Sequence, residues 1–179
     1  MKQIRNIGFL ILIAGVIVGL DQWAKAWVRA TLTLGEWWNP IAWMRPYLHL
    51  TFWTNTGMAF GQLQNAGPIL TVVAIIVSGI ILWYYWQLPA GQWWVRAALA
   101  MQLGGAIGNL VDRLRFGTVT DWIEVTHFPV FNLADASISV GVAVLALLLW
   151  RESRAEAAKP APPSPVSPSE NATSESSAQ

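Results

Sequence analysis

Hydrophobic and polar positions divide the chain into four long apolar segments separated by more polar stretches. The apolar segments cover about residues 7–28, 68–88, 93–111 and 134–150. Because an α-helix rises about 1.5 Å per residue, roughly 20 residues cross the hydrocarbon core of a bilayer. The pattern therefore predicts an all-α membrane protein with four transmembrane helices.

The first apolar segment follows a short basic stretch, Met1–Arg5, which is also how a secretory signal peptide begins. No cleavage site made of small residues closes the segment before Asp21, and apolar residues resume as far as Trp27. We therefore expect the segment to be retained as the first span. In the third segment, Arg96 lies near the start, where a long side chain can extend toward the membrane surface.

Two polar stretches, residues 29–67 and 112–133, separate the spans on one side of the membrane. Each contains a run that resembles a β-strand, Tyr47–Trp53 in the first and Thr118–Val125 in the second. Together these loops predict a small β-rich platform on the membrane surface. Residues 155–179 are rich in Pro, Ser, Ala and Glu, and predict a disordered tail behind a four-span domain over residues 1–154.

The composition supports a membrane protein, with 54% hydrophobic and 12% charged residues, against about 25% charged in soluble domains. Many of the 12 Trp residues flank the apolar segments, as indole rings favour the membrane–water boundary. The net charge is +1 and the basic residues are scattered, so no nucleic-acid partner is expected. A slight excess of basic residues beside the chain ends predicts that both termini are cytoplasmic and both loops extracytoplasmic.

Several kinds of chemistry lack the residues that they need. The chain has no cysteine, which excludes disulfides, thiol nucleophiles and cysteine-bound metals. The two histidines, His49 and His127, do not follow a zinc-binding spacing and offer little to a Ser-His-Asp arrangement. We expect neither a metal nor a cofactor.

Polar residues collect where the apolar segments end. Asp21 and Lys25 are four residues apart and share a helix face, so a self-contained ion pair explains them. Asn109 and Arg113 repeat this spacing at the end of the third segment, with Asp112 within reach. Helix-end polarity is the structural interpretation of these residues. Before them, the Gly104–Gly108 spacing is typical of close packing between helices in lipid.

Other polar positions also have structural explanations. Asn55 and Gly57 are typical turn residues. Asn132 is suited to the N-cap of the last span, with Asp135 as the acidic partner in a capping box. Neither explanation accounts for Asp121, which lies within the second strand-like run.

If the carboxyl groups of Asp121 and Asp135 lie close together in the fold, we expect them to share one proton. The N-terminus of the last helix favours a negative charge at Asp135. Val119, Trp122 and Ile123 surround Asp121 in the sequence with apolar groups, which favour its protonated form. Such a pair can deprotonate water and protonate a carbonyl, as in aspartic peptidases.

The sequence resembles lipoprotein signal peptidase, also called signal peptidase II, in five stretches that occur in the order of the family. These stretches are Asp21–Lys25, Asn55–Gly61, Gly104–Arg113, Val119–Ile123 and Phe131–Asp135. The chain departs from the family at Ala24, where Ser or Thr is common, and at Trp122, where Phe is common. Each stretch alone is a weak signal, whereas five in order on four spans are specific.

The resemblance implies an aspartic endopeptidase of the bacterial inner membrane that cuts prolipoproteins immediately before a diacylglyceryl-modified Cys. It implies that Asp121 and Asp135 are catalytic and that the site lies near the periplasmic face. Further site residues implied by the resemblance are Asn55, Gly57, Asn109, Arg113 and Asn132, with Asp21 and Lys25 in support. The expected partners are the lipidated prolipoprotein and membrane phospholipid, and the expected state is a monomer.

Two other classes of protein remain open at this stage. A small transporter would use the carboxylates as binding groups, although no acidic residue falls in the middle of a predicted span. A non-catalytic membrane scaffold would use the same residues as helix caps and ion pairs.

Overall fold

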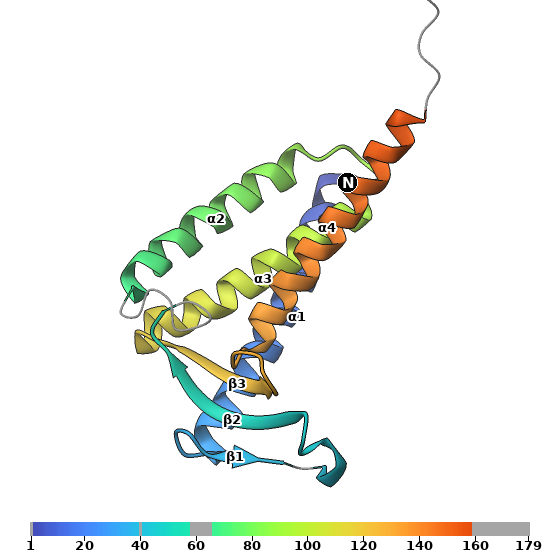
Figure 1. Cartoon of the computed structure of the whole chain (residues 1–179). Helices are drawn as coiled ribbons and strands as arrows, with labels where there is room; N and C mark the ends of the chain where they lie inside the picture. Colours follow the sequence, from blue (N-terminus) through green and yellow to red (C-terminus); the bar gives the residue numbers. More distant parts are fainter. Residues whose placement is uncertain (1, 40, 58–65, 159–179) are drawn as a thin grey trace, which may run out of the picture. The chain divides into compact units, whose positions relative to one another are not determined.

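The structure, a computed structural model, describes residues 2–39, 41–57 and 66–158. Within these residues, four long helices accompany a three-stranded antiparallel sheet (Figure 1). The helices are α1 (Lys2–Thr31), α2 (Gly67–Gln87), α3 (Trp93–Phe116) and α4 (Leu133–Ala157). The strands are β1 (Trp37–Trp38), β2 (Leu48–Asn55) and β3 (Val119–Val125), and a short 3₁₀ helix, η1 (Ala42–Met44), lies between β1 and β2. The chain divides into two units, Met1–Leu148 and Leu149–Gln179, and the contacts described below lie in the first.

All four predicted apolar segments form helices, and three of these helices are long and apolar enough to cross a membrane. These are Ile4–Thr31, Gly67–Gln87 and Leu133–Ala157. Their large apolar side chains, such as Ile11, Ile76 and Leu147, are exposed, which favours contact with lipid. The prediction of a helical membrane protein is supported for three spans, and the fourth stays a prediction.

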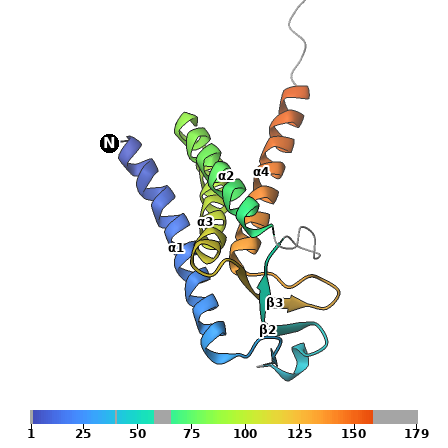
Figure 2. The same cartoon turned by 90° about the vertical axis from the view of Figure 1, so that its left-hand side faces the viewer.

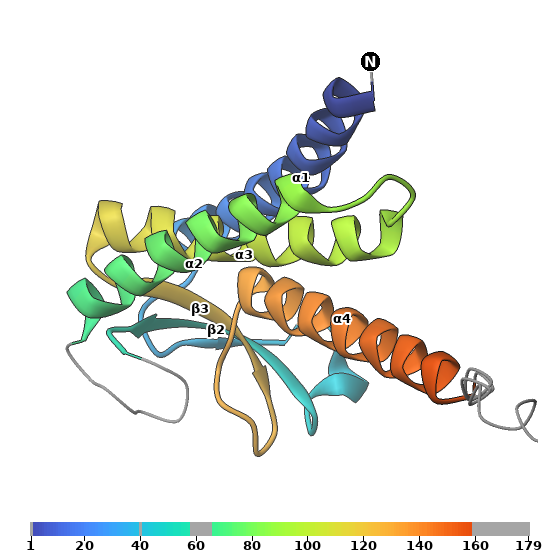
Figure 3. The ribbon, with the colours of Figure 1, turned by 90° about the horizontal axis from the view of Figure 1, so that it is seen from above.

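Helix α3 differs from the other three because it is covered by protein. It packs against both α1 and α2, and its Leu99 and Leu103 lie in a buried cluster with Leu10 of α1 and Ile81 of α2. A helix that presents little surface to lipid tolerates more polar residues. Polar and charged side chains accordingly collect at its last turns. Figure 3 shows α2 running alongside α3.

Glycines on α3 and α4 allow the helices to approach closely. A Cβ atom at Gly104 would lie 3.0 Å from the main-chain oxygen of Ala14 in α1. One at Gly141 of α4 would lie 2.7 Å from the main-chain oxygen of Ala98 in α3. The small-residue spacing thus allows close helix packing, as predicted, and both α1 and α4 lie in close contact with α3.

The sheet lies where α1 and α3 end and α4 begins (Figures 1 and 2). Strand β2 pairs antiparallel with both β1 and β3, and in the second pair Trp53 is opposite Asp121. Gly117 closes α3 with a positive φ of 75° and donates its N–H to the carbonyl of Arg113 at 3.0 Å. This tight turn starts β3 directly beside the last turns of α3. The predicted small sheet is therefore confirmed.

Some predicted boundaries differ from the observed ones. The loop predicted over 112–133 starts later, because α3 continues to Phe116 and includes Asp112 and Arg113. Helix α4 continues through Ala157, beyond the predicted start of the tail. Residues 58–61 of the Asn55–Gly61 stretch, and the tail from residue 159, lie outside the described residues. The domain division, the tail and the sidedness of the membrane stay predictions.

Candidate active site

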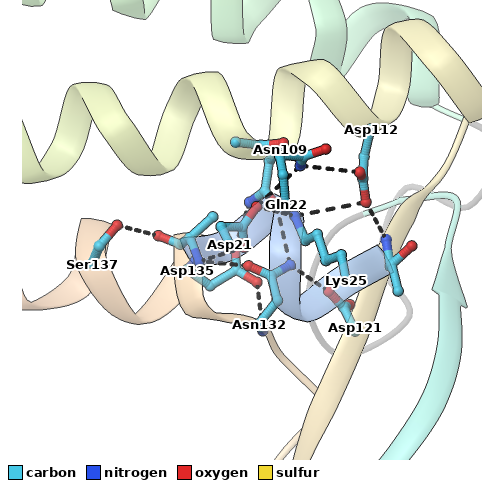
Figure 4. A network of polar contacts seen from close by, with 12 residues as sticks. Asp21, Gln22, Lys25, Asn109, Asp112, Asp121, Asn132, Asp135 and Ser137 are labelled. Atoms are coloured by element: carbon cyan, nitrogen blue, oxygen red, sulfur yellow. Dashed lines mark hydrogen bonds and ion pairs between the residues drawn. The ribbon is translucent and has the colours of Figure 1, made fainter. Parts of the chain in front are cut away.

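Asp121 lies in the middle of β3 with its side chain buried, at 1% exposure. Its carboxyl group accepts hydrogen bonds from the side-chain amides of two asparagines, of which Figure 4 shows Asn132. Asn55 at the end of β2 donates at 2.9 Å, and Asn132 just before α4 donates at 2.7 Å. The carboxyl group is therefore held from a neighbouring strand and from the start of a helix.

Asp135 occupies the first turn of α4. It accepts a hydrogen bond from the side chain of Asn109 in α3 at 2.7 Å and one from the main-chain N–H of Asn132 at 3.3 Å. The side-chain oxygen of Asn132 in turn accepts the N–H of Asp135 at 3.0 Å. The capping box is thus present, and the same Asn132 also binds Asp121. A single asparagine bridges the two carboxyl groups.

The surroundings of Asp121 favour a proton on its carboxyl group. Burial raises the pKa of Asp121 to about 7, and the nearby charge of Asp135 acts in the same direction. The hydrogen bonds from Asn55 and Asn132 oppose this shift, because they stabilise the ionised form. Asp121 can therefore give and take a proton near neutral pH.

Lys25 and Asp21 form the predicted ion pair, with Lys25 Nζ 2.9 Å from Asp21 Oδ2 and both side chains fully buried. The pair is not self-contained. Lys25 donates to the side-chain oxygen of Asn109 at 2.8 Å, and Asp21 accepts the N–H of Ala134 in the first turn of α4 at 3.0 Å. The pair thus orients the asparagine that binds Asp135 and also fixes the start of α4.

A pocket of about 590 Å³ opens beside both carboxyl groups. Its polar lining is Asn55, Asn109, Arg113, Asp121, Asp135 and Ser139. The rest of its lining is Gly57, Leu70, Val119, Phe128, Pro129, Val130, Phe131, Ala136 and Val140. A buried site with paired carboxyl groups and a mainly apolar wall suits acid–base chemistry on an apolar substrate.

Two further sequence-predicted residues have definite places at this pocket. Gly57 donates its N–H to the side-chain oxygen of Asn55 at 2.9 Å, and this bond orients the Asn55 amide. The charge of the Arg113 side chain acts on Asp135, Asp121 and Asp112. All nine site residues predicted from the sequence therefore lie in the pocket wall or in the polar network behind it.

Sequence reasoning left three members of this network unassigned. Gln22, Arg29 and Thr120 all make hydrogen bonds within it. Arg29 follows Asp21 and Lys25 at the four-residue helical spacing, so this periodicity was an available signal. Thr120 carried no signal, since its contribution comes from its position beside Asp121 in β3.

The fold and the site define a helical membrane protein with one buried and one partly buried carboxyl group placed for acid–base chemistry. The family model described as Signal peptidase (SPase) II matches residues 13–151. The chain is 40% identical to the lipoprotein signal peptidase of Moorella thermoacetica over 135 residues, covering 75% of this chain and 88% of that one. It is 36% identical to the lipoprotein signal peptidase of Halothermothrix orenii over 139 residues, covering 78% and 93%.

Solved structures show the same fold. One, described as a bacterial membrane enzyme, superposes with a TM-score of 0.79 at 28% identity, covering 87% of this chain and 96% of that one. A second, with the same description, superposes with a TM-score of 0.72 at 29% identity, covering 80% and 93%. The chain belongs to the signal peptidase II family, a family of proteases. That family is neither of the alternatives, transport or a scaffold, that the sequence left open.

Proposed function

We propose that the chain is an aspartic endopeptidase of the bacterial inner membrane that removes the signal peptides of prolipoproteins. Cleavage falls immediately before a diacylglyceryl-modified Cys. Membership of the family and relatives called lipoprotein signal peptidase support this function. The observation that carries it is the Asn132 bridge between Asp121 and Asp135 at a shared pocket.

In this proposal Asp121 begins the reaction protonated and Asp135 begins it ionised. Asp135 takes a proton from a water molecule, whose oxygen attacks the carbonyl carbon of the scissile peptide, while Asp121 protonates the carbonyl oxygen. In the second step, Asp135 returns its proton to the leaving nitrogen as the C–N bond breaks. Asp121 recovers its proton from a hydroxyl group of the tetrahedral intermediate, which leaves a carboxyl group and an amine.

The neighbouring residues have supporting roles in this mechanism. Asn55 and Asn132 orient the Asp121 carboxyl group, and Asn109 orients that of Asp135. Gly57 holds Asn55 in place. We assign Arg113, whose charge acts on both carboxyl groups at the pocket, to orienting the main chain of the substrate.

The mainly apolar wall of the pocket supports a substrate made of a signal helix and acyl chains. We also propose α3 as a fourth span. Helix α2 begins near the sheet, a short turn at residues 88–92 follows it, and α4 begins near the sheet again. The intervening α3 must therefore return across the same thickness. An even number of spans leaves both termini on one side of the membrane, which we take to be the cytoplasmic side. We further propose that the protein is a monomer, that its site lies near the periplasmic face, and that it contacts membrane phospholipid.

Cleavage of a lipidated prolipoprotein by detergent-purified protein tests this function. We expect that wild type cleaves only after the Cys is diacylglycerated. Asp121→Asn and Asp135→Asn should each lose at least about 10³-fold in rate, because neither amide can exchange the proton. Glu124→Gln is the matched control, as it changes a carboxylate of β3 that is outside the pocket wall.

Two outcomes would contradict the proposal. Substantial cleavage by either Asp→Asn variant would exclude the paired carboxyl groups as the catalytic residues. If a folded wild-type protein leaves the lipidated substrate intact, the proposed substrate class is wrong.

A further inference from the structure

Asp112 of α3 is fully buried, and the proposed mechanism leaves it without a role. Its Oδ2 atom accepts the main-chain N–H of Thr120 at 2.8 Å. Thr120 directly precedes Asp121 in β3. This hydrogen bond therefore fixes the β3 backbone immediately beside a proposed catalytic carboxyl group, from the last turns of α3 (Figure 4).

Asp112 also lies between two cations of α1. Lys25 Nζ is 3.6 Å from Asp112 Oδ2, and Arg29 Nη1 is 3.5 Å from Asp112 Oδ1. Arg29 donates to the Thr120 hydroxyl at 2.7 Å, and Gln22 donates to Asp112 Oδ1 at 3.2 Å. A single carboxylate thus joins α1, α3 and β3.

The charges around the site balance only when the carboxyl groups hold one proton. Three cations stand against four carboxyl groups, namely Lys25, Arg29 and Arg113 against Asp21, Asp112, Asp121 and Asp135. They come from α1, α3, β3 and α4, while β2 contributes the neutral Asn55. Since an uncompensated charge is costly in a buried site, this balance favours one proton shared by Asp121 and Asp135.

We propose that Asp112 is a positioning residue for the reaction, which fixes Asp121 through Thr120 and whose negative charge keeps the shared proton on the two catalytic carboxyl groups. The inference rests on the proposed function. Under this inference, the pH range in which the enzyme works depends on the charged residues behind the pocket as well as on the groups that face it.

The test measures the cleavage rate of a lipidated prolipoprotein against pH for Asp112→Asn, Arg29→Gln and the double variant. Asp112→Asn keeps a side-chain oxygen that can accept the Thr120 N–H but removes a negative charge. Arg29→Gln removes a positive charge from a side chain that is 21% exposed. Arg115→Gln is the matched control, because it removes the same charge from an exposed position near the end of α3.

The two single variants should shift the alkaline limb of the pH profile in opposite directions. Loss of the Asp112 charge makes the site more positive, so the shared proton leaves more easily and the limb moves to lower pH by about one unit. Loss of the Arg29 charge should move the limb to higher pH by a similar amount. The double variant restores the charge balance and should return the limb toward that of wild type. Arg115→Gln should leave it unchanged.

A purely structural Asp112 would lower the rate equally at every pH. The proposal is therefore overturned if both single variants keep the wild-type limb or move it in the same direction. It is also overturned if Asp112→Asn is inactive and the double variant stays inactive. Wild-type protein that fails to cleave would overturn the proposed function and this inference together, whereas wild-type cleavage with unshifted limbs overturns this inference alone.

Discussion

A buried cation lies at each end of α3, and the two cations have different partners. At the Trp93 end, Arg96 is 3% exposed and donates to the main-chain carbonyl of Leu88 at 2.7 Å. Its guanidinium lies 4.8 Å from the centre of the Tyr85 ring. At the Phe116 end, Lys25 of α1 instead meets the carboxylates of Asp21 and Asp112.

Under the proposed function, this difference separates a structural joint from the site that exchanges protons. The carbonyls around Arg96 belong to the last residues of α2 and the turn after it, where helix ends leave acceptors unpaired. Neutral carbonyls do not titrate, and the hydrogen bonds of Arg96 at this end join two helices. At the other end the carboxyl groups outnumber the cations, and burial raises the pKa of Asp121 to about 7, which favours a proton on its carboxyl group. A surplus of carboxyl groups marks this end, which holds the proposed catalytic pair and is called the reactive end below.

The comparison is tested most strongly by replacing the two cations with an apolar side chain of similar length. Lys25→Met leaves Asp21 and Asp112 with less compensation, so the free energy of unfolding should fall by about 3–5 kcal/mol and cleavage should be lost. Arg96→Met removes hydrogen bonds to carbonyls, which costs about 1–3 kcal/mol, and should leave kcat near the wild-type value. Thermal unfolding and single-turnover cleavage in the same detergent measure both effects.

The proposed difference between the two ends of α3 is wrong if Arg96→Met reduces kcat as strongly as Lys25→Met in protein that remains folded. It also fails if Lys25→Met retains wild-type cleavage.

Replacing the neutral Asn132 at the reactive end should lower kcat more strongly than it lowers the free energy of unfolding. Asn132→Ala removes the donor to Asp121 and the acceptor for the Asp135 N–H. We expect kcat to fall by about 10²-fold, because both carboxyl groups lose orientation, while the missing helix cap costs about 1 kcal/mol. Asn132→Ser restores a capping oxygen without the amide donor and adds no charge to the buried site, so only the stability should recover. Recovery of kcat in Asn132→Ser would show that capping alone explains this residue.

The pH dependence follows from the proton held at the reactive end. Burial raises the pKa of Asp121 from 3.8 to about 7, so the protonated form is favoured in the folded protein. Cleavage should fall about tenfold per pH unit above that pKa, as the proton is lost. The same shift stabilises the fold at low pH, and this contribution disappears as the pH rises from about 4 through about 7. A rate that is flat from pH 6 to 9 would contradict the assignment.

The sequence was sufficient to predict four apolar helices, a small sheet and nine residues that the structure places around one pocket. Spacing along a single helix carried part of this information, as with Asp21 and Lys25. The cap formed by Asn132 and Asp135 was also visible locally. What the sequence pattern could not give was the meeting of elements far apart in the chain, such as the contact of Asp112 with the N–H of Thr120.

Arg96 shows the same limit at the other end of α3. Its position near the start of a predicted span led us to expect a side chain that extends toward the membrane surface. In the structure it turns to the carbonyls at the end of α2 and is buried. An amino-acid pattern identifies a charged side chain in an apolar region, but neighbouring helices decide whether lipid, water or protein surrounds it.

The smallest of these effects concerns how closely α1 approaches the reactive end. A Cβ atom at Gly108 would lie 2.7 Å from Asp21 Oδ2, whereas one at Gly15 of α1 would meet nothing within 4 Å. Gly108→Ala should therefore displace Asp21, cost about 1–3 kcal/mol and slow cleavage a few-fold. Gly15→Ala should leave the rate unchanged, since it adds a methyl group in open space. Equal effects of the two variants would mean that helix propensity, and not the distance between α1 and α3, explains the glycine.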